Sequence, residues 1–124
     1  MKFVLVIYND PALYEALPQA ETDRMMRGCL AHADELRRDG RLADSQMLEG
    51  AETAKSVRIR NGRTKVMDGP FSEAKEVLGG FNLIEAKDMD EAIEIAKEFP
   101  WASTGCVEVR PLRDIETVRR QVNR

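Results

Sequence analysis

Apolar residues first gather in a continuous run near the start of the chain, over residues 3–8. The run is rich in β-branched and aromatic side chains, and Asn9-Asp10-Pro11 ends it. A strand with one solvated face would alternate apolar and polar residues, so this run predicts a central strand that is covered on both faces. We expect a loop with room for one helical turn over residues 11–18.

A helical period then replaces the strand pattern over residues 21–39, and Gly40 stands where a residue that tolerates a left-handed backbone would end the helix. Residues 42–48 predict a second strand, although few of its positions are strongly apolar. The stripe of the helix that we expect to face the core consists of Met25, Cys29, Ala33 and Leu36, widened by Met26 and Leu30.

The clearest local signal is Asn61-Gly62, which lies between two alternating segments, residues 56–60 and 63–67. Asn-Gly is the preferred pair for a two-residue hairpin turn, and a loop of that length sets the register of the two strands. Four cations therefore share one face of the predicted hairpin, and apolar residues share the other. The opposed pairs are Arg60 and Arg63, Ile59 and Thr64, Arg58 and Lys65, and Val57 and Val66.

A second strand–helix–strand unit follows, with strands predicted over residues 78–86 and 104–110. Asp88 and Glu91 have the spacing of a capping box at the start of the helix, and Pro100 ends it. The inward stripe expected for this helix consists of Met89, Ala92, Ile93, Ala96 and Phe99.

Together these elements predict a ferredoxin-like α+β sandwich, in which the hairpin is an insertion between two strand–helix–strand units. Residues 1–112 would form this one domain, and residues 113–124 a basic tail or a short helix. Helices would cover only one face of the antiparallel sheet, yet the first strand is apolar on both faces. A second copy of the chain, packed sheet against sheet, would cover the other face, so we expect a homodimer.

Composition narrows the range of functions. The chain has 124 residues, which is the length of one domain, and a net charge of −3 from 19 cations and 22 anions. This balance argues against a nucleic-acid-binding protein.

The longest apolar run is too short to span a membrane and no cleavage region follows it, which predicts a cytoplasmic protein without a membrane contact. No metal-ligand spacing, phosphate-binding loop or dinucleotide fingerprint occurs, so we expect no metal and no cofactor. Cys29 and Cys106 are expected to be reduced and buried.

The stretch after the hairpin carries a family resemblance. Asp68-Gly69-Pro70-Phe71, Lys75-Glu76 and Leu78-Gly79-Gly80 together resemble the signature of the DGPF-domain branch of the YCII-related family. The likeness covers residues 2–112 and implies a dimeric α+β barrel. It also implies a largely uncharacterised protein, often bacterial, and in some genomes encoded near extracytoplasmic-function sigma factors.

In the related YCII branch, a histidine on the first helix and an aspartate before a proline form a proposed acid–base pair. At least one such protein is a dehydrochlorinase of a chlorinated hydroxyquinol. Counting back from Gly40, the position of the histidine carries Cys29 rather than His32, and the aspartate corresponds to Phe99 before Pro100. Both members of the pair are missing, so the resemblance does not carry the dehydrochlorinase activity to this chain.

The catalytic candidates are therefore His32 and Asp68. His32 is the only histidine, and its side chain alone has an unperturbed pKa suited to proton transfer near neutral pH. It lies at the edge of the apolar helix stripe, where a pocket-lining or a half-buried structural histidine would lie. Asp68 precedes Gly69-Pro70, which forces a tight turn, so its carboxylate either caps that turn or points into a cleft.

Candidate substrate-binding residues surround this turn or line an apolar cavity. Glu73 and Lys75 would either pair with each other or present a polar rim to a ligand. Tyr8 and Trp101 would be aromatic walls, or else core and interface residues. Arg58 belongs to the cationic hairpin face, which solvent, neighbouring carboxylates or an anionic ligand would stabilise.

Two functions fit these residues. The first is a small-molecule pocket protein that works by acid–base chemistry without a cofactor. The second is a non-enzymatic interaction or regulatory module, linked to sigma-factor regulation, that uses the basic hairpin to bind a protein partner.

Overall fold

The elements of the protein, seen in a computed structural model that describes residues 1–70 and 74–124, follow the order that the sequence predicts. The strands are β1 (Lys2–Asn9), β2 (Leu42–Met47), β3 (Lys55–Arg60), β4 (Arg63–Asp68), β5 (Val77–Glu85) and β6 (Gly105–Pro111). The helices are α1 (Pro11–Glu15), α2 (Gln19–Arg38), α3 (Met89–Lys97) and α4 (Ile115–Val122), with short 3₁₀ helices η1 (Ala51–Thr53) and η2 (Pro100–Ser103).

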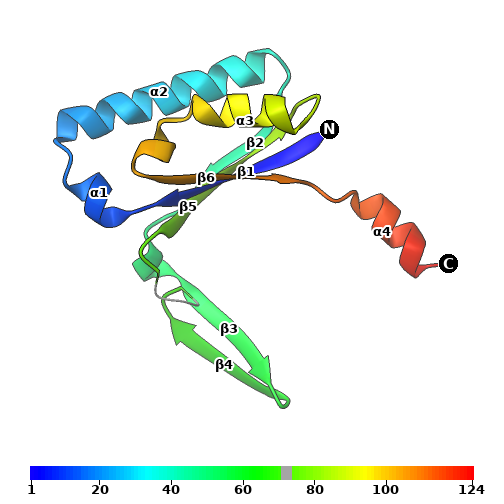
Figure 1. The fold of residues 1–124 in the computed structure, drawn as a ribbon. Coiled ribbons are helices and arrows are strands. Elements are labelled where there is room, and N and C mark those ends of the chain that lie inside the picture. The colour runs from blue at the N-terminus through cyan, green and yellow to red at the C-terminus, as the bar shows by residue number, and fades with distance from the viewer. Residues whose placement is uncertain (71–73) are drawn as a thin grey trace.

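One antiparallel sheet, with strand order β2-β5-β1-β6, organises the fold. β1 pairs along its length with β5 and with β6, so the longest apolar run of the chain is a central strand, as predicted. Helices α2 and α3 lie together on one face of this sheet (Figure 1). This order and layering confirm the ferredoxin-like α+β fold.

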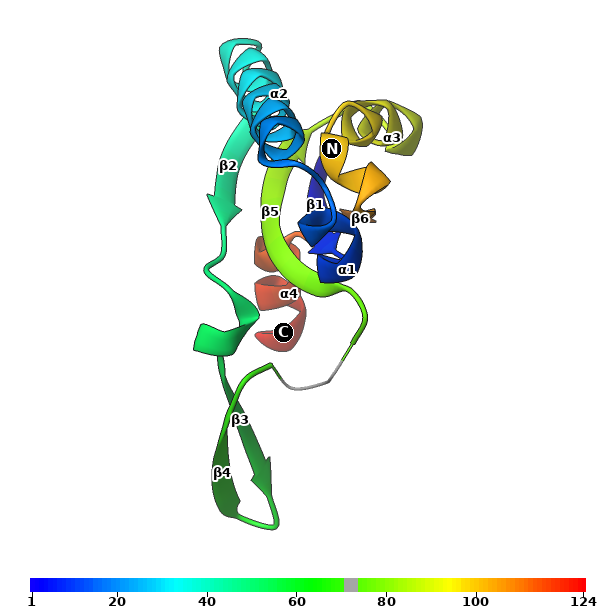
Figure 2. The ribbon, with the colours of Figure 1, turned by 90° about the vertical axis from the view of Figure 1, so that its left-hand side faces the viewer.

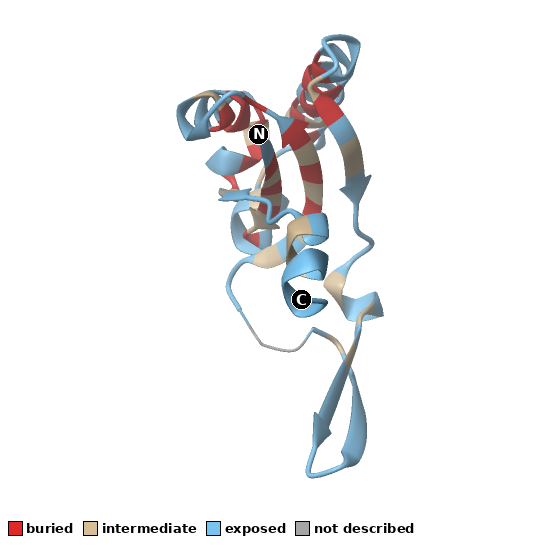
Figure 3. Ribbon diagram, turned by 90° about the vertical axis from the view of Figure 1, so that its right-hand side faces the viewer, coloured by how far each residue is buried: buried red, intermediate tan, exposed pale blue. Residues whose placement is uncertain are grey.

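The core lies between the sheet and these two helices, where buried residues concentrate (Figure 3). From β1, the side chains of Phe3, Leu5 and Ile7 enter it, because alternate residues of a strand share a face. The buried residues of α2 are Thr22, Met25, Cys29, His32, Ala33 and Leu36. Those of α3 are Ala92, Ile95 and Ala96, and Phe99 follows the helix.

Three apolar residues that were expected to be inward lie outside the core. Leu30 is 49% exposed, Ile93 38% and Met89 36%. On α2 the buried surface extends toward His32 instead, because that flank faces α3. On α3 the buried stripe passes through Ile95, which leaves Met89 and Ile93 on the solvent-facing flank.

Local end signals have the predicted geometry. Gly40 has φ of +73°, and the next residue, Arg41, donates its backbone N–H to the Leu36 carbonyl at 2.9 Å, which ends α2. At the start of α3, Asp88 accepts the backbone N–H of Glu91 at 2.9 Å, which is the N-cap half of the predicted capping box, while the Glu91 carboxylate reaches the N–H of Lys87 rather than that of Asp88. Asp10 caps α1 by accepting the Ala12 N–H, so residues that were expected to form a loop include a short helix.

The β3–β4 hairpin projects away from the sheet (Figures 1 and 2). Its pairing is the predicted one, with Arg58 opposite Lys65 and Arg60 opposite Arg63. Asn61 and Gly62 both have positive φ, 54° and 74°, as the predicted turn requires. The hairpin and α4 extend on the side of the sheet away from α2 and α3 (Figure 1).

The second face of the sheet carries partly exposed apolar side chains in the single chain. Val6 pairs with Phe81 of β5 and with Glu108 of β6, and Val4 pairs with Leu83, which puts these residues on the face opposite the core. We call it the open face, because within the described part of the chain no helix covers it (Figure 1). Cys106 is exposed on this face, so the expectation that both cysteines are buried is wrong for Cys106.

Candidate functional site

His32 joins two helices. It is only 7% exposed, and its Nε2 lies 3.0 Å from the carbonyl oxygen of Ile95. Its Nδ1 lies 3.4 Å from the Glu98 carboxylate, and its ring meets Phe99 edge-on with the ring centres 4.5 Å apart. Each nitrogen therefore faces an acceptor at the C-terminal end of α3, which is the arrangement of a structural histidine that ties α2 to α3.

Asp68 lies at the end of β4, at the base of the hairpin, where its exposed carboxylate pairs with Lys55 of the neighbouring strand. The turn after it depends on other groups. Gly69 has φ of +88°, donates its N–H to the Ala54 carbonyl at 2.7 Å, and accepts the Ser56 hydroxyl at 2.7 Å. The glycine makes the tight turn possible, since an L-residue is strained at this φ.

Lys75 and Tyr8 meet at a shallow cleft on the open face, which Glu76, Cys106 and Glu108 also line. The Tyr8 hydroxyl lies 3.5 Å from the Glu108 carboxylate. The Lys75 ammonium lies 3.6 Å from the carboxylate of Asp10, which is only 3% exposed. Lys75 therefore pairs with Asp10, the residue that caps α1. Glu73, the other residue expected near this turn, lies outside the described residues.

Trp101 lies on the other side of the sheet, where it is one wall of a pocket of about 220 Å³. The pocket is half-open and lies between α1, α2 and η2 on one side and β1, β5 and β2 on the other. Among the described residues it is lined by Ile7, Asn9, Tyr14, Met26, Cys29, Ser45, Gln46, Met47, Leu48, Gly79, Gly80, Phe81, Asn82 and Trp101.

The structure therefore distributes the predicted site residues over several places. Trp101 lines this half-open pocket, and Tyr8 and Lys75 line the open-face cleft. His32 lies between α2 and α3, while Asp68 and Arg58 belong to the projecting hairpin. Within the described part of the chain, no cavity joins His32 to Asp68.

Gly80 explains why the pocket exists. It pairs with Ile7 of β1 and with Met47 of β2, so it lies on the core-facing side of β5. A Cβ at this position would collide with the carbonyl oxygen of Gln46. The strands can approach only because residue 80 has no side chain, and the floor of the pocket is left open there.

The polar groups of the pocket are held in place by hydrogen bonds. Ser45 donates its hydroxyl to the side-chain oxygen of Asn82 at 2.6 Å, and these residues are direct cross-strand partners. Trp101 donates its indole N–H to the sulfur of Cys29 at 3.3 Å. Tyr14 lies beside Trp101, with the ring centres 6.2 Å apart.

Cys29 is a neutral thiol in this pocket. Burial raises the pKa of its sulfur above the ordinary value, and the hydrogen bond from Trp101 opposes this only in part. Because the thiolate is the reactive form, Cys29 acts here as a packing residue and a hydrogen-bond acceptor. Cys29 was predicted from the sequence only as a core residue, and Asn82 was placed only within a strand. Asn82 could have been noticed because it is a polar residue at a position of β5 that faces the core.

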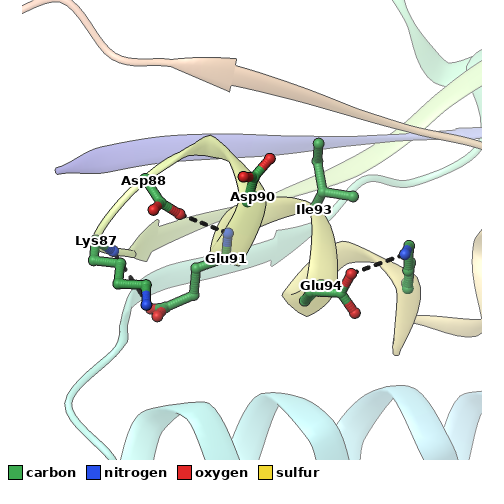
Figure 4. Close-up of a pocket in the computed structure, with 7 residues that line it drawn as sticks. Lys87, Asp88, Asp90, Glu91, Ile93 and Glu94 are labelled. Atoms are coloured by element: carbon green, nitrogen blue, oxygen red, sulfur yellow. Dashed lines mark hydrogen bonds and ion pairs between the residues drawn. The ribbon is translucent and has the colours of Figure 1, made fainter.

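A surface depression along α3 lacks the arrangement of fixed polar groups around a pocket that is seen near Trp101 (Figure 4). Its polar residues already serve the helix itself. Asp88 caps the N–H of Glu91, the Glu91 carboxylate accepts the Lys87 N–H at 3.4 Å, and Glu94 pairs with Lys97 one turn later. These are helix-end and surface contacts, and they make no site.

Comparison with known proteins places the chain among its relatives. The family model of the YCII-related domain matches residues 1–116. An uncharacterised protein of Rhizobium meliloti (strain 1021) is 39% identical over 114 residues, which are 90% of this chain and 92% of the relative. No helix of the described residues is both long and apolar enough to cross a membrane.

A solved structure has the same fold. It is 5-chloro-2-hydroxyhydroquinone dehydrochlorinase (TftG) from Burkholderia phenoliruptrix AC1100, in complex with 2,5-dihydroxybenzoquinone. The superposition has a TM-score of 0.54 and covers 91% of this chain and 94% of that one, at 17% sequence identity. This likeness supports the fold alone.

Proposed function

The chain belongs to the YCII-related domain family, and on this premise we propose that it binds a small molecule, about the size of one six-membered ring, in the pocket beneath α2. The observation that carries the proposal is the pocket itself: about 220 Å³, with an aromatic wall and a few fixed polar groups. Apolar cavities of roughly 150 Å³ are large enough to bind benzene.

Three features support ligand binding at this place. Gly80 keeps the floor of the pocket free of a side chain, at a position where a larger residue would collide with β2. The combination of apolar lining and a few convergent polar groups is typical of small-molecule sites. A protein of the same fold, TftG, was solved in complex with a single-ring compound.

The geometry supports binding more directly than acid–base catalysis. The ring nitrogens of His32 face Ile95 and Glu98, and the carboxylate of Asp68 faces Lys55. Neither residue lines the pocket, and the pocket thiol, Cys29, is neutral because burial raises its pKa. The proposed activity is therefore recognition of a small ring compound.

Titration with phenol and hydroquinone, followed by two-dimensional amide NMR, tests this function. Trp101 is the only tryptophan of the sequence, so its indole N–H gives a single signal from the pocket wall. We expect that signal and the amide signals of Gly80 and Asn82 to shift. Shifts confined to Tyr8, Cys106 and Glu108 would assign binding to the open-face cleft, and no shift at all would contradict a ring-binding site.

The two tyrosines supply a matched pair of variants. Tyr14→Phe removes a hydroxyl beside the pocket, whereas Tyr8→Phe removes one on the opposite side of the sheet. We expect only Tyr14→Phe to weaken phenol binding, by about three- to ten-fold if its hydroxyl contacts the ligand.

A homodimer through the open face completes the proposal. Its support is the run of paired apolar residues on that face, Val4 with Leu83 and Val6 with Phe81, which a second sheet would cover. Light scattering at micromolar concentration tests it, and we expect the mass of two chains. A monomer under these conditions would contradict it.

A further inference from the structure

We propose that the pocket takes an uncharged, planar, single-ring molecule whose polar substituent hydrogen-bonds to the side-chain amide of Asn82. This inference rests on the proposed binding function and names the class of ligand. Three observations carry it: the absence of charge in the described lining, a buried amide with one end free, and an aromatic wall made by Trp101 and Tyr14.

None of the described residues that line the pocket carries a charge. An ion that binds in this half-open pocket loses part of its water shell and finds no counter-charge there, which is costly beside apolar walls. The cleft on the other side of the sheet differs, since Lys75, Glu76 and Glu108 line it. The same sheet therefore presents a charged surface on one side and an uncharged pocket on the other, and the pocket selects a neutral ligand.

Asn82 is the polar group best placed to orient that ligand. It is only 5% exposed, and the Ser45 hydroxyl holds one end of its amide at 2.6 Å. Every fully buried side-chain nitrogen or oxygen in the described part of the chain has a hydrogen-bond partner. The other end of the Asn82 amide has no protein partner in that part of the chain, so it is not fully buried and faces the pocket that Asn82 lines. The rigid pairing of β2 with β5 fixes its direction.

The aromatic wall adds shape selection. The indole N–H of Trp101 is occupied by the sulfur of Cys29, so Trp101 offers the ligand its ring rather than a donor. Tyr14 packs beside it at a tilt of 54°. A flat ring can contact this wall while its substituent reaches Asn82, because aromatic groups favour offset or edge contacts of this kind.

Three compounds of similar shape but different charge test whether the pocket prefers a neutral ligand, separately from whether it binds a ring at all. Benzamide, benzoate and benzamidinium have nearly the same shape but carry no charge, a negative charge and a positive charge. Titration at pH 7, followed by Trp101 fluorescence and its indole NMR signal, gives the three affinities. We expect benzamide to bind at least about ten-fold more tightly than either ion, because only the ions lose a strong hydration shell that no charged group of the pocket replaces.

The outcomes distinguish the two claims. If benzoate or benzamidinium binds as tightly as benzamide, the ligand class proposed here is wrong while the ring-binding function stands. If none of the three changes the Trp101 signals, the proposed ligand class is wrong; both proposals fail if phenol and hydroquinone also leave these signals unchanged.

Substitution of Asn82 tests its role. Asn82→Asp adds a negative charge of nearly the same shape, and we expect it to invert the preference, so that benzamidinium binds more tightly than benzamide. Asn123→Asp makes the same change at an exposed position near the C-terminus and should leave the wild-type order intact. An unchanged preference in Asn82→Asp would assign recognition to another residue.

A gentler variant keeps the test open if Asn82→Asp does not fold. Ser45→Ala releases the held end of the Asn82 amide without adding charge or volume. We expect benzamide to bind about three- to ten-fold more weakly, since a fixed hydrogen-bonding group becomes mobile. Equal affinity in Ser45→Ala and the wild type would contradict the role of the held amide.

Discussion

The two faces of one sheet differ in what covers them, although the same strands supply both. On β1, Phe3 and Leu5 point to the helices and are fully buried, whereas Val4 and Val6, one residue further along each time, point to the open face. The covered face is completed within the chain and contains an uncharged pocket. The open face mixes apolar side chains with Glu108 and Arg110 and is flanked by the hairpin and α4 (Figure 2). The contrast in burial supports the proposed ligand site on one face and the proposed dimer contact on the other.

The difference follows from the connections. Each strand–helix–strand unit crosses over with the same hand, so α2 and α3 reach the same face of the sheet. The remaining segments, β3–β4 and α4, project from the other side and expose apolar residues, with Val57 63% and Ile115 70% exposed. The chain therefore has one self-sufficient core and one surface suited to a second copy.

Truncation of one residue on each face gives the largest expected contrast. Phe3→Ala should lower the free energy of unfolding by about 3–5 kcal/mol, because it removes a fully buried ring from a packed core. Val6→Ala should cost less than about 1.5 kcal/mol in the monomer, since Val6 is only half-buried there. Urea unfolding curves at a protein concentration low enough to keep the chain monomeric measure both, and equal losses would refute the asymmetry between the faces.

A charge on the open face should separate the proposed dimer. Val6→Lys puts an ammonium opposite Phe81, where a second sheet would bury it, and we expect dissociation to monomers at micromolar concentration. Analytical ultracentrifugation measures this. The matched variant Arg110→Lys keeps the charge of the same face and should remain dimeric; dissociation of both variants would place the interface elsewhere.

The two cysteines report on the two faces separately. In the Val6→Lys variant, whose open face we expect to be free of a second copy, Cys106 is exposed and Cys29 is buried with a raised pKa, so a thiol reagent at pH 8 should label Cys106 at least about 100-fold faster. At any given pH the raised pKa leaves Cys29 with less thiolate than an ordinary cysteine. Mass spectrometry of Cys29→Ser and Cys106→Ser identifies each rate. Fast labelling of Cys29 would mean that the pocket opens readily.

His32 sharpens the comparison within the covered side. His32→Leu keeps the volume but leaves the Ile95 carbonyl without its side-chain partner, and we expect a loss of about 1–3 kcal/mol in unfolding free energy. Benzamide affinity should not change, because His32 does not line the pocket. A large loss of affinity with unchanged stability would restore the catalytic or binding role that the sequence suggested.

The smallest effects belong to the turn after the hairpin. Gly69→Ala should destabilise the protein by about 1 kcal/mol, because its φ of +88° strains any residue with a Cβ. Asp68→Asn should cost less than about 0.5 kcal/mol, since its ion pair with Lys55 is exposed. Thermal unfolding of the two variants decides whether the glycine or the carboxylate matters more in this motif.

Much of the fold was readable from short stretches of sequence. Asn61-Gly62 predicted the hairpin and its register, Gly40 the end of α2, and Asp88 with Glu91 the start of α3. The core-facing residues of α2 and α3 were predicted less well. The apolar stripe of a helix has a flank on each side, and only the neighbouring element decides which of the two flanks is buried. Ile95 was missed and Ile93 wrongly included for this reason.

The candidate site was harder to predict. Trp101 was read either as a cavity wall or as a core or interface residue; it is buried and borders the pocket, whereas Tyr8, read as the other wall, lies across the sheet. Cys29 and Asn82 were read as core and strand residues, since nothing near them in sequence shows that Gly80 leaves space between them.

By itself, the sequence determined most of the elements, several of their ends and the hairpin register, because those depend on hydrogen bonds and periodicity among residues close along the chain. The ferredoxin-like order pairs residues far apart, such as Phe3 and Pro111, and was predicted from the rules for connecting strand–helix–strand units. Only the tertiary structure decided which side chains share a cavity. The pocket joins Tyr14 of α1, Cys29 of α2, Asn82 of β5 and Trp101 of η2. Their meeting depends on how strands approach and helices rotate in the packed core, and no local pattern records it.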